Sequence, residues 1–177
     1  LVVVGGGVAG TCTAVSAARL GCKVALVQNR PVLGGNNSSE VRVHLGGKIN
    51  MEPYPALGNL VREVGPRTHG NARPAENYED QKKLDVVGAE ESLHLFLNMH
   101  AFDVQMDGDR IVAVVAKHIR NNKEYRFTAP LFADCTGDGT LGFLAGADFR
   151  MGRESRDETD EELAVEKADK MTMGTSI

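Results

Sequence analysis

The feature that most constrains the fold is a cluster of glycines directly after the first apolar residues. Residues 1–4 form a continuous apolar run, which is typical of a parallel strand buried on both faces. Residues 5–10 (GGGVAG) follow and fit the spacing G-x-G-x-x-G. In this pattern Gly5 makes the turn out of the strand, Gly7 lets the backbone approach a diphosphate, and Gly10 lets a helix pack on the strand.

The residues after the cluster complete a βαβ unit. Residues 8–20 are mostly small and apolar, which suits a helix packed closely on a sheet, and Gly21 stands where a helix C-cap belongs. Residues 23–27 predict a second short strand. A diphosphate would bind at the N–H groups that begin the helix. The alternative interpretation is a glycine-rich loop without a ligand.

Composition excludes several other classes of protein. The chain has 177 residues, of which 42% are hydrophobic and 25% charged, as in ordinary globular domains. A net charge of −4 argues against nucleic acid as a partner, and no apolar run is long enough to span a membrane. The three cysteines contain no Cys-x-x-Cys pair and the five histidines no H-x-x-x-H spacing, so we expect no metal site.

The middle of the chain combines a long irregular segment with a β-meander. Residues 29–73 are rich in Pro, Gly and Asn, and they predict an excursion over a ligand with one short helix near residues 56–64. The other expected elements are a helix at 78–91, a strand at 93–99, a meander at 101–106, 111–118 and 124–129, a strand at 131–134 and a helix at 140–147.

The position after the second strand departs from the usual dinucleotide pattern. An acidic residue that binds ribose is expected about 20 residues beyond the glycines, but Gln28 stands there and is neutral. Arg30 would accept a 2′-phosphate, so the residues alone leave NADP open as the ligand. A solvated surface charge is the alternative interpretation of Arg30.

Two further segments resemble a known family. Residues 28–35 (QNRPVLGG) resemble the Arg-x-x-x-Gly-Gly turn of flavoproteins of the glutathione-reductase type, and residues 132–139 (FADCTGDG) resemble their Thr-Gly-Asp signature. The continuation is similar to a bacterial branch of FAD-dependent oxidoreductases. The resemblance implies an α/β fold, with a FAD-type Rossmann parallel sheet and an inserted antiparallel β-meander over residues 1–150. Residues 151–177 would begin a substrate or cap region, or form a tail.

The resemblance also implies the cofactor and the residues that bind it. In fumarate-reductase relatives a histidine seven residues before a Gly-Gly pair carries the flavin covalently. Counting back from Gly46-Gly47, the residue at that position in this chain is Ser39, so we expect non-covalent FAD. The implied pyrophosphate and ribityl contacts are Gly5, Gly7, Gly10, Gly34, Gly35 and Asn36. The implied adenosine contacts are Gln28, Arg30 and the backbone of Val104, placed near the end of the strand after the connecting helix, and Thr136, Gly137 and Asp138 would close over the dinucleotide.

The implied function is hydride transfer between FAD and an unidentified small substrate. The chain has Gln28 where the family has Glu, and it lacks the family's C-terminal Gly-Asp segment. We therefore expect the N-terminal part of a longer enzyme, inactive in isolation. His44 lies in the loop expected near the flavin, although a loop histidine without a catalytic role is the favoured interpretation. An NAD(P)-dependent dehydrogenase and a non-catalytic dinucleotide-binding module stay open as alternatives. We expect a cytoplasmic protein, and the sequence does not determine its oligomeric state.

Overall fold

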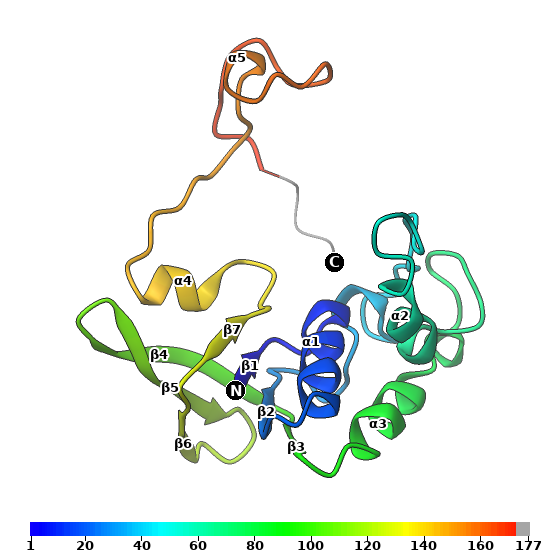
Figure 1. Ribbon diagram of the computed structural model, residues 1–177, viewed down its shortest axis with the longest axis vertical. Helices are drawn as coiled ribbons and strands as arrows, with labels where there is room; N and C mark the ends of the chain where they lie inside the picture. Colours follow the sequence, from blue (N-terminus) through cyan, green and yellow to red (C-terminus); the bar gives the residue numbers. More distant parts are fainter. Residues whose placement is uncertain (173–177) are drawn as a thin grey trace. The chain divides into compact units, whose positions relative to one another are not determined.

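Four short parallel strands form the central sheet, in the order β3-β2-β1-β7 (Figure 1). They are β1 (Val2–Val4), β2 (Val24–Val27), β3 (Leu93–Phe96) and β7 (Phe132–Asp134). β1 lies between β2 and β7 and is buried along its whole length, as its continuous apolar sequence predicts. The structure is a computed structural model that describes residues 1–172.

The two faces of β1 pack against different layers. Val3 belongs to a core with α1 (Val8–Arg19), whose Ala14 and Val15 are fully buried. Val2 and Val4 belong to a second core on the opposite face. Because successive side chains of a strand point to opposite faces, one run of apolar residues serves both cores.

An antiparallel meander covers the second face (Figure 1). Its strands are β4 (Met99–Asp107), β5 (Arg110–His118) and β6 (Glu124–Thr128), paired in that order. The predicted combination of a parallel sheet with an inserted meander is therefore confirmed. The expected strand at residues 93–99 is divided in two, because Asn98 adopts a left-handed conformation (φ 58°) that ends β3 and starts β4.

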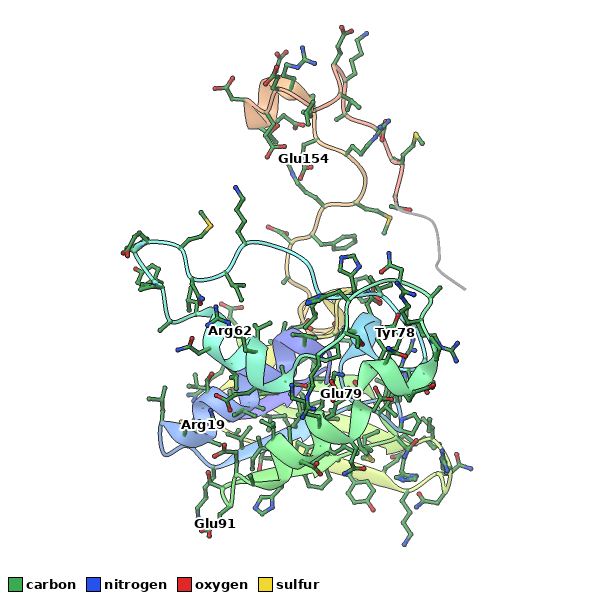
Figure 2. The ribbon with its side chains drawn as sticks, turned by 90° about the vertical axis from the view of Figure 1, so that its right-hand side faces the viewer. Arg19, Arg62, Tyr78, Glu79, Glu91 and Glu154 are labelled. Atoms are coloured by element: carbon green, nitrogen blue, oxygen red, sulfur yellow. The ribbon has the colours of Figure 1, made fainter. Side chains whose placement is uncertain are left out.

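The segment between β2 and β3 contains four short helices. They are η1 (Gly35–Asn37), α2 (Gly58–Val64), η2 (Ala75–Tyr78) and α3 (Asp80–Gly88). In Figure 1, α2 and α3 lie on the far side of α1 from the sheet. The guanidinium of Arg19, labelled in Figure 2, joins these parts because it pairs with the carboxylates of both Glu63 (2.8 Å) and Glu90 (2.7 Å).

The chain divides into two units, Leu1–Gly146 and Ala147–Ile177. The first ends with α4 (Thr140–Leu144). The second contains α5 (Arg156–Thr159), whose start is closed by a capping box between Ser155 and Glu158. Within residues 1–172, no helix is both long and apolar enough to cross a membrane.

The packing of α1 on β1 makes Gly10 a sensitive position. A Cβ at Gly10 would lie 1.8 Å from the carbonyl oxygen of Gly5, so we expect Gly10→Ala to lower the free energy of unfolding by about 3 kcal/mol. Gly88 ends α3, and a Cβ there meets nothing within 4 Å, so Gly88→Ala should be neutral or stabilising by about 0.5 kcal/mol. Urea unfolding followed by circular dichroism measures both. Equal stability of the two variants would show that α1 does not need this close approach.

Candidate functional site

The glycine turn (residues 5–10) contains two kinds of glycine. Gly5 has φ +100°, and a Cβ there would lie 2.1 Å from the carbonyl oxygen of Cys135, directly after the neighbouring strand β7. Gly5 and Gly10 are therefore required by packing. Gly7 differs, because a Cβ at Gly7 meets nothing within 4 Å. The outward face of Gly7 is open space beside the start of α1.

Gly6 is a third constrained position, which the motif leaves unspecified. Gly6 is buried, and a Cβ there would lie 2.6 Å from the Leu33 side chain and 2.9 Å from Gln28 Cβ. Its N–H donates to Gln28 Oε1 at 2.8 Å. The consecutive glycines of this sequence were the only signal for this role.

The start of α1 is suited to binding an anion. Gly7 is the N-cap residue, and no side chain caps the helix or places a carboxylate in its first turn. The first N–H groups of an α-helix have no partner within the helix. Together with the positive end of the helix dipole, they attract a phosphate group that approaches past Gly7.

A second turn, formed by Gly34 and Gly35, closes against the first. Gly34 pairs with Gly7 as a short parallel bridge, and the Gly34 N–H donates to the Gly6 carbonyl at 2.8 Å. A Cβ at Gly35 would lie 3.1 Å from Gly7 Cα. Asn36 follows in η1 and is exposed. The structure thus brings Gly34, Gly35 and Asn36 next to the glycine turn.

A buried lysine supports this second turn. Lys83 on α3 is 1% exposed, and its Cε would lie 2.7 Å from a Cβ at Gly34. Its ammonium donates to the Tyr78 carbonyl at 2.5 Å and lies 4.0 Å from the Asp80 carboxylate. Burial lowers the pKa of Lys83, and the nearby carboxylates of Asp80 and Glu79 oppose this effect. Lys83 lies four residues before the buried Val87, on the same face of α3, but the sequence gives no warning of its burial because lysine is rarely found in the interior.

The buried side chain of Gln28 connects the two turns through hydrogen bonds. Its side chain is buried, with Oε1 accepting from the Gly6 N–H and Nε2 donating to the Val32 carbonyl at 3.0 Å. Arg30 is half-exposed, and its guanidinium pairs with the Glu40 carboxylate at 3.1 Å. The amide of Gln28 keeps one lone pair and one N–H for a further partner.

The expectation that Val104 stands at the end of the strand after the connecting helix is wrong. Val104 lies in the middle of β4, where it pairs with Val114 and is buried in the core beneath the meander. The strand after α3 ends at Phe96, because Asn98 turns the chain there. The main chain that lies beside the end of β2 is instead that of Asn98 and Met99, which donate to the carbonyls of Arg30 (3.2 Å) and Gln28 (2.8 Å).

The loop at the end of β7 is organised by Asp134. Its carboxylate accepts hydrogen bonds from Thr136 N–H (3.0 Å) and Oγ (2.7 Å), and from the main-chain N–H groups of Leu141 (2.7 Å) and Gly142 (3.1 Å). The loop with Thr136, Gly137 and Asp138 is thereby held next to β1 and Gly5, and Gly137 and Asp138 are exposed. The sequence pattern alone does not indicate this role of Asp134.

His44 lies beyond the second turn. The preceding residue, Val43, donates its N–H to the Asn36 carbonyl at 2.9 Å and accepts from the Asn37 side chain at 2.9 Å. His44 is exposed, and its Nδ1 lies 2.8 Å from Asn71 Oδ1. Within residues 1–172, no cluster of His, Cys, Asp or Glu could hold a metal ion.

The hydrogen bonds of Asp134 predict a pH-dependent stability. Desolvation raises the pKa of this carboxyl, but the hydrogen bonds from Thr136, Gly142 and Leu141 outweigh it, so the pKa lies below its ordinary value of 3.8. A lowered folded-state pKa stabilises the protein above the unfolded-state pKa, and this contribution is lost as the pH falls through the folded-state value.

We expect Asp134→Asn to lower the free energy of unfolding near pH 7 by about 1–3 kcal/mol, because the amide nitrogen cannot accept the bonds that Oδ2 accepts. The difference from the wild type should shrink toward about pH 3. Urea unfolding at both pH values measures it. A difference that stays constant would show that the charge of Asp134 does not stabilise the loop.

Comparison with known proteins gives the same architecture. A family model described as FAD dependent oxidoreductase matches residues 1–175. The glycerol-3-phosphate dehydrogenase from Bacillus halodurans complexed with FAD is 15% identical with a TM-score of 0.55, over 81% of this chain and 36% of that chain. A flavoprotein/dehydrogenase from Cytophaga hutchinsonii is 18% identical with a TM-score of 0.55, over 85% and 42%.

A third structure is similar over a comparable share. The 3-ketosteroid-delta4-(5alpha)-dehydrogenase from Rhodococcus jostii RHA1 is 15% identical with a TM-score of 0.53, over 75% of this chain and 44% of that chain. The chain thus spans less than half of each of these three proteins. At these identities the likeness shows the fold. The family model covers nearly the whole sequence, and the chain therefore belongs to the FAD dependent oxidoreductase family.

Proposed function

We propose that the protein binds FAD non-covalently and uses it to exchange a hydride with a small-molecule substrate. One observation carries the proposal: the open face of Gly7 lies between the uncapped start of α1 and the turn at Gly34 and Gly35. Backbone N–H groups and a close main-chain approach are what a diphosphate requires. The family supports FAD as the dinucleotide.

The residues present fit this cofactor. The N–H groups at the start of α1 would hold the diphosphate, with Gly35 and Asn36 along the same path. Gln28 and Arg30, directly after β2 and beside the main chain of Met99, would face the adenosine ribose. Thr136, Gly137 and Asp138 would close over the dinucleotide from the end of β7, next to Gly5.

Bound FAD supplies the acceptor and donor of an electron pair, and the protein supplies position and electrostatics. Residues 1–150 would form the FAD-binding domain, and residues 151–177 would begin a substrate or cap region. An NAD(P)-dependent dehydrogenase has weaker support, because the Glu40 carboxylate occupies the guanidinium of Arg30 that would accept a 2′-phosphate. We further propose that the protein is cytoplasmic and does not bind nucleic acid, in line with its net charge of −4.

Gly7→Ala tests the phosphate assignment without disturbing the fold. The backbone at Gly7 (φ −62°, ψ 179°) is allowed for alanine, and the new methyl group meets no protein atom within 4 Å. We expect unchanged thermal stability of the apoprotein and at least a 100-fold weaker Kd for FAD, about 2.7 kcal/mol. Fluorescence titration with FAD measures the Kd. Wild-type affinity in this variant would exclude Gly7 from the phosphate site.

The mode of attachment is tested separately. Because Ser39 stands at the expected attachment position, FAD should be released completely when the loaded protein is denatured by acid. The supernatant should then contain all of the flavin, measured by its absorbance at about 450 nm. Yellow colour that stays with the precipitated polypeptide, or a peptide mass increased by FAD, would contradict non-covalent binding.

A further inference from the structure

One oxygen atom of Asn71 determines which tautomer neutral His44 adopts. Asn71 Oδ1 lies 2.9 Å from the main-chain N of His44 and 2.8 Å from its Nδ1. A main-chain N–H only donates, so the atom that it contacts must be the amide oxygen and not the amide nitrogen. An amide oxygen only accepts, so Nδ1 must carry a proton.

Neutral His44 is therefore the Nδ1–H tautomer, and its Nε2 carries a lone pair. Among the hydrogen bonds within residues 1–172, none involves this Nε2. The residue is exposed, and a Cβ at Gly46 would come within 3.5 Å of Nε2.

A buried tyrosine fixes both partners of this pair. Tyr78, labelled in Figure 2, is 2% exposed, and its hydroxyl lies within hydrogen-bond distance of the carbonyls of Arg42 and Gly70. It also accepts from the Arg73 N–H at 3.3 Å, and the Ala72 N–H donates to the Arg42 carbonyl at 2.9 Å. The main chain on either side of Asn71, and the chain that leads to His44, are thus held by one interior side chain.

The pair also begins directly beyond the proposed cofactor turn. Val43 is bonded to Asn36 and Asn37 through its N–H and its carbonyl, and His44 is the next residue. The sequence alone favours a loop histidine without a catalytic role. An exposed imidazole held in one tautomer by a buried support is instead what a proton-transfer site requires.

We propose that His44 Nε2 takes the proton released when the substrate is oxidised, and that Asn71 is the positioning residue that holds the proton of the neutral ring on Nδ1, so that Nε2 presents its lone pair. This proposal rests on the proposed function. Bound FAD would supply the acceptor for one hydrogen and an electron pair of the substrate, and the second hydrogen would leave as a proton to His44 Nε2, which becomes part of an imidazolium. In the reverse direction the imidazolium returns that proton.

The tautomer of His44 is measured on the protein without any cofactor. The method is heteronuclear NMR of the isotope-labelled protein, at a pH where its imidazole side chains are uncharged. His44 should show a protonated Nδ1 and an unprotonated Nε2. His118 is an internal reference of opposite type, because its Nδ1 accepts from the Arg120 N–H at 3.3 Å. Asn71→Leu should convert His44 to a mixture of tautomers. A protonated Nε2 in neutral wild-type His44 would overturn the proposal.

The proton-accepting role is measured on the FAD-loaded protein with nitroethane as the probe. Neutral nitroethane must lose its α-proton before it can give electrons, whereas its nitronate anion has already lost it. Oxidation of the nitronate consumes one water, yields acetaldehyde and nitrite, and transfers two electrons to FAD, which bleaches the absorbance near about 450 nm. The readout therefore separates proton removal from electron transfer.

We expect His44→Ala to slow bleaching by neutral nitroethane about 100-fold, to leave bleaching by nitronate unchanged, and to recover on addition of free imidazole. Asn71→Leu should show a smaller loss, and His118→Ala none. The FAD absorbance before nitroethane is added shows separately whether the proposed function holds. Equal rates for wild type and His44→Ala with neutral nitroethane would overturn the proposal.

Discussion

The structure depends on a close approach of main-chain atoms that leaves no space for side chains. Gly10 packs against the carbonyl of Gly5, and Gly5 packs against the carbonyl of Cys135, the residue that follows β7. Gly6 receives the turn at Gly34 through a main-chain hydrogen bond. Helix α1 can therefore lie directly on β1, and the ends of the parallel strands converge at the start of that helix. The face of Gly7 left open at this point is the centre of the proposed cofactor site.

Interactions within a short stretch of sequence were predictable. The apolar run of β1, the glycine turn and the helix after it are all encoded within about 20 residues, as in other βαβ units. The meander was predictable because alternating β-rich segments are separated by turn residues such as Gly108 and Asn122. Val104 was misplaced because it belongs to β4, the first strand of the meander, and not to the strand that follows α3, which ends at Phe96.

Interactions between distant segments were not predictable. Lys83 is buried because α3 packs its stem on Gly34; it shares a face of α3 with Val87, but a lysine in that position reads as a surface residue until the contact with Gly34 is seen. The pairing of Asn71 with His44 spans 27 residues of irregular chain, and it is defined only where Tyr78 brings the two segments together. The proposed phosphate site consists of main-chain groups, and a short sequence motif can encode it. The side chains that support it come from α3 and from the irregular segment between β2 and α3.

The central claim is that the glycine turn holds the diphosphate of FAD, and a calorimetric titration of the apoprotein tests it most directly. FAD and riboflavin share the flavin ring, but only FAD carries the diphosphate and the adenosine. The account predicts that FAD binds at least about 100-fold more tightly than riboflavin, and that ADP competes with FAD. Equal affinity for FAD and riboflavin, with no competition from ADP, would contradict it.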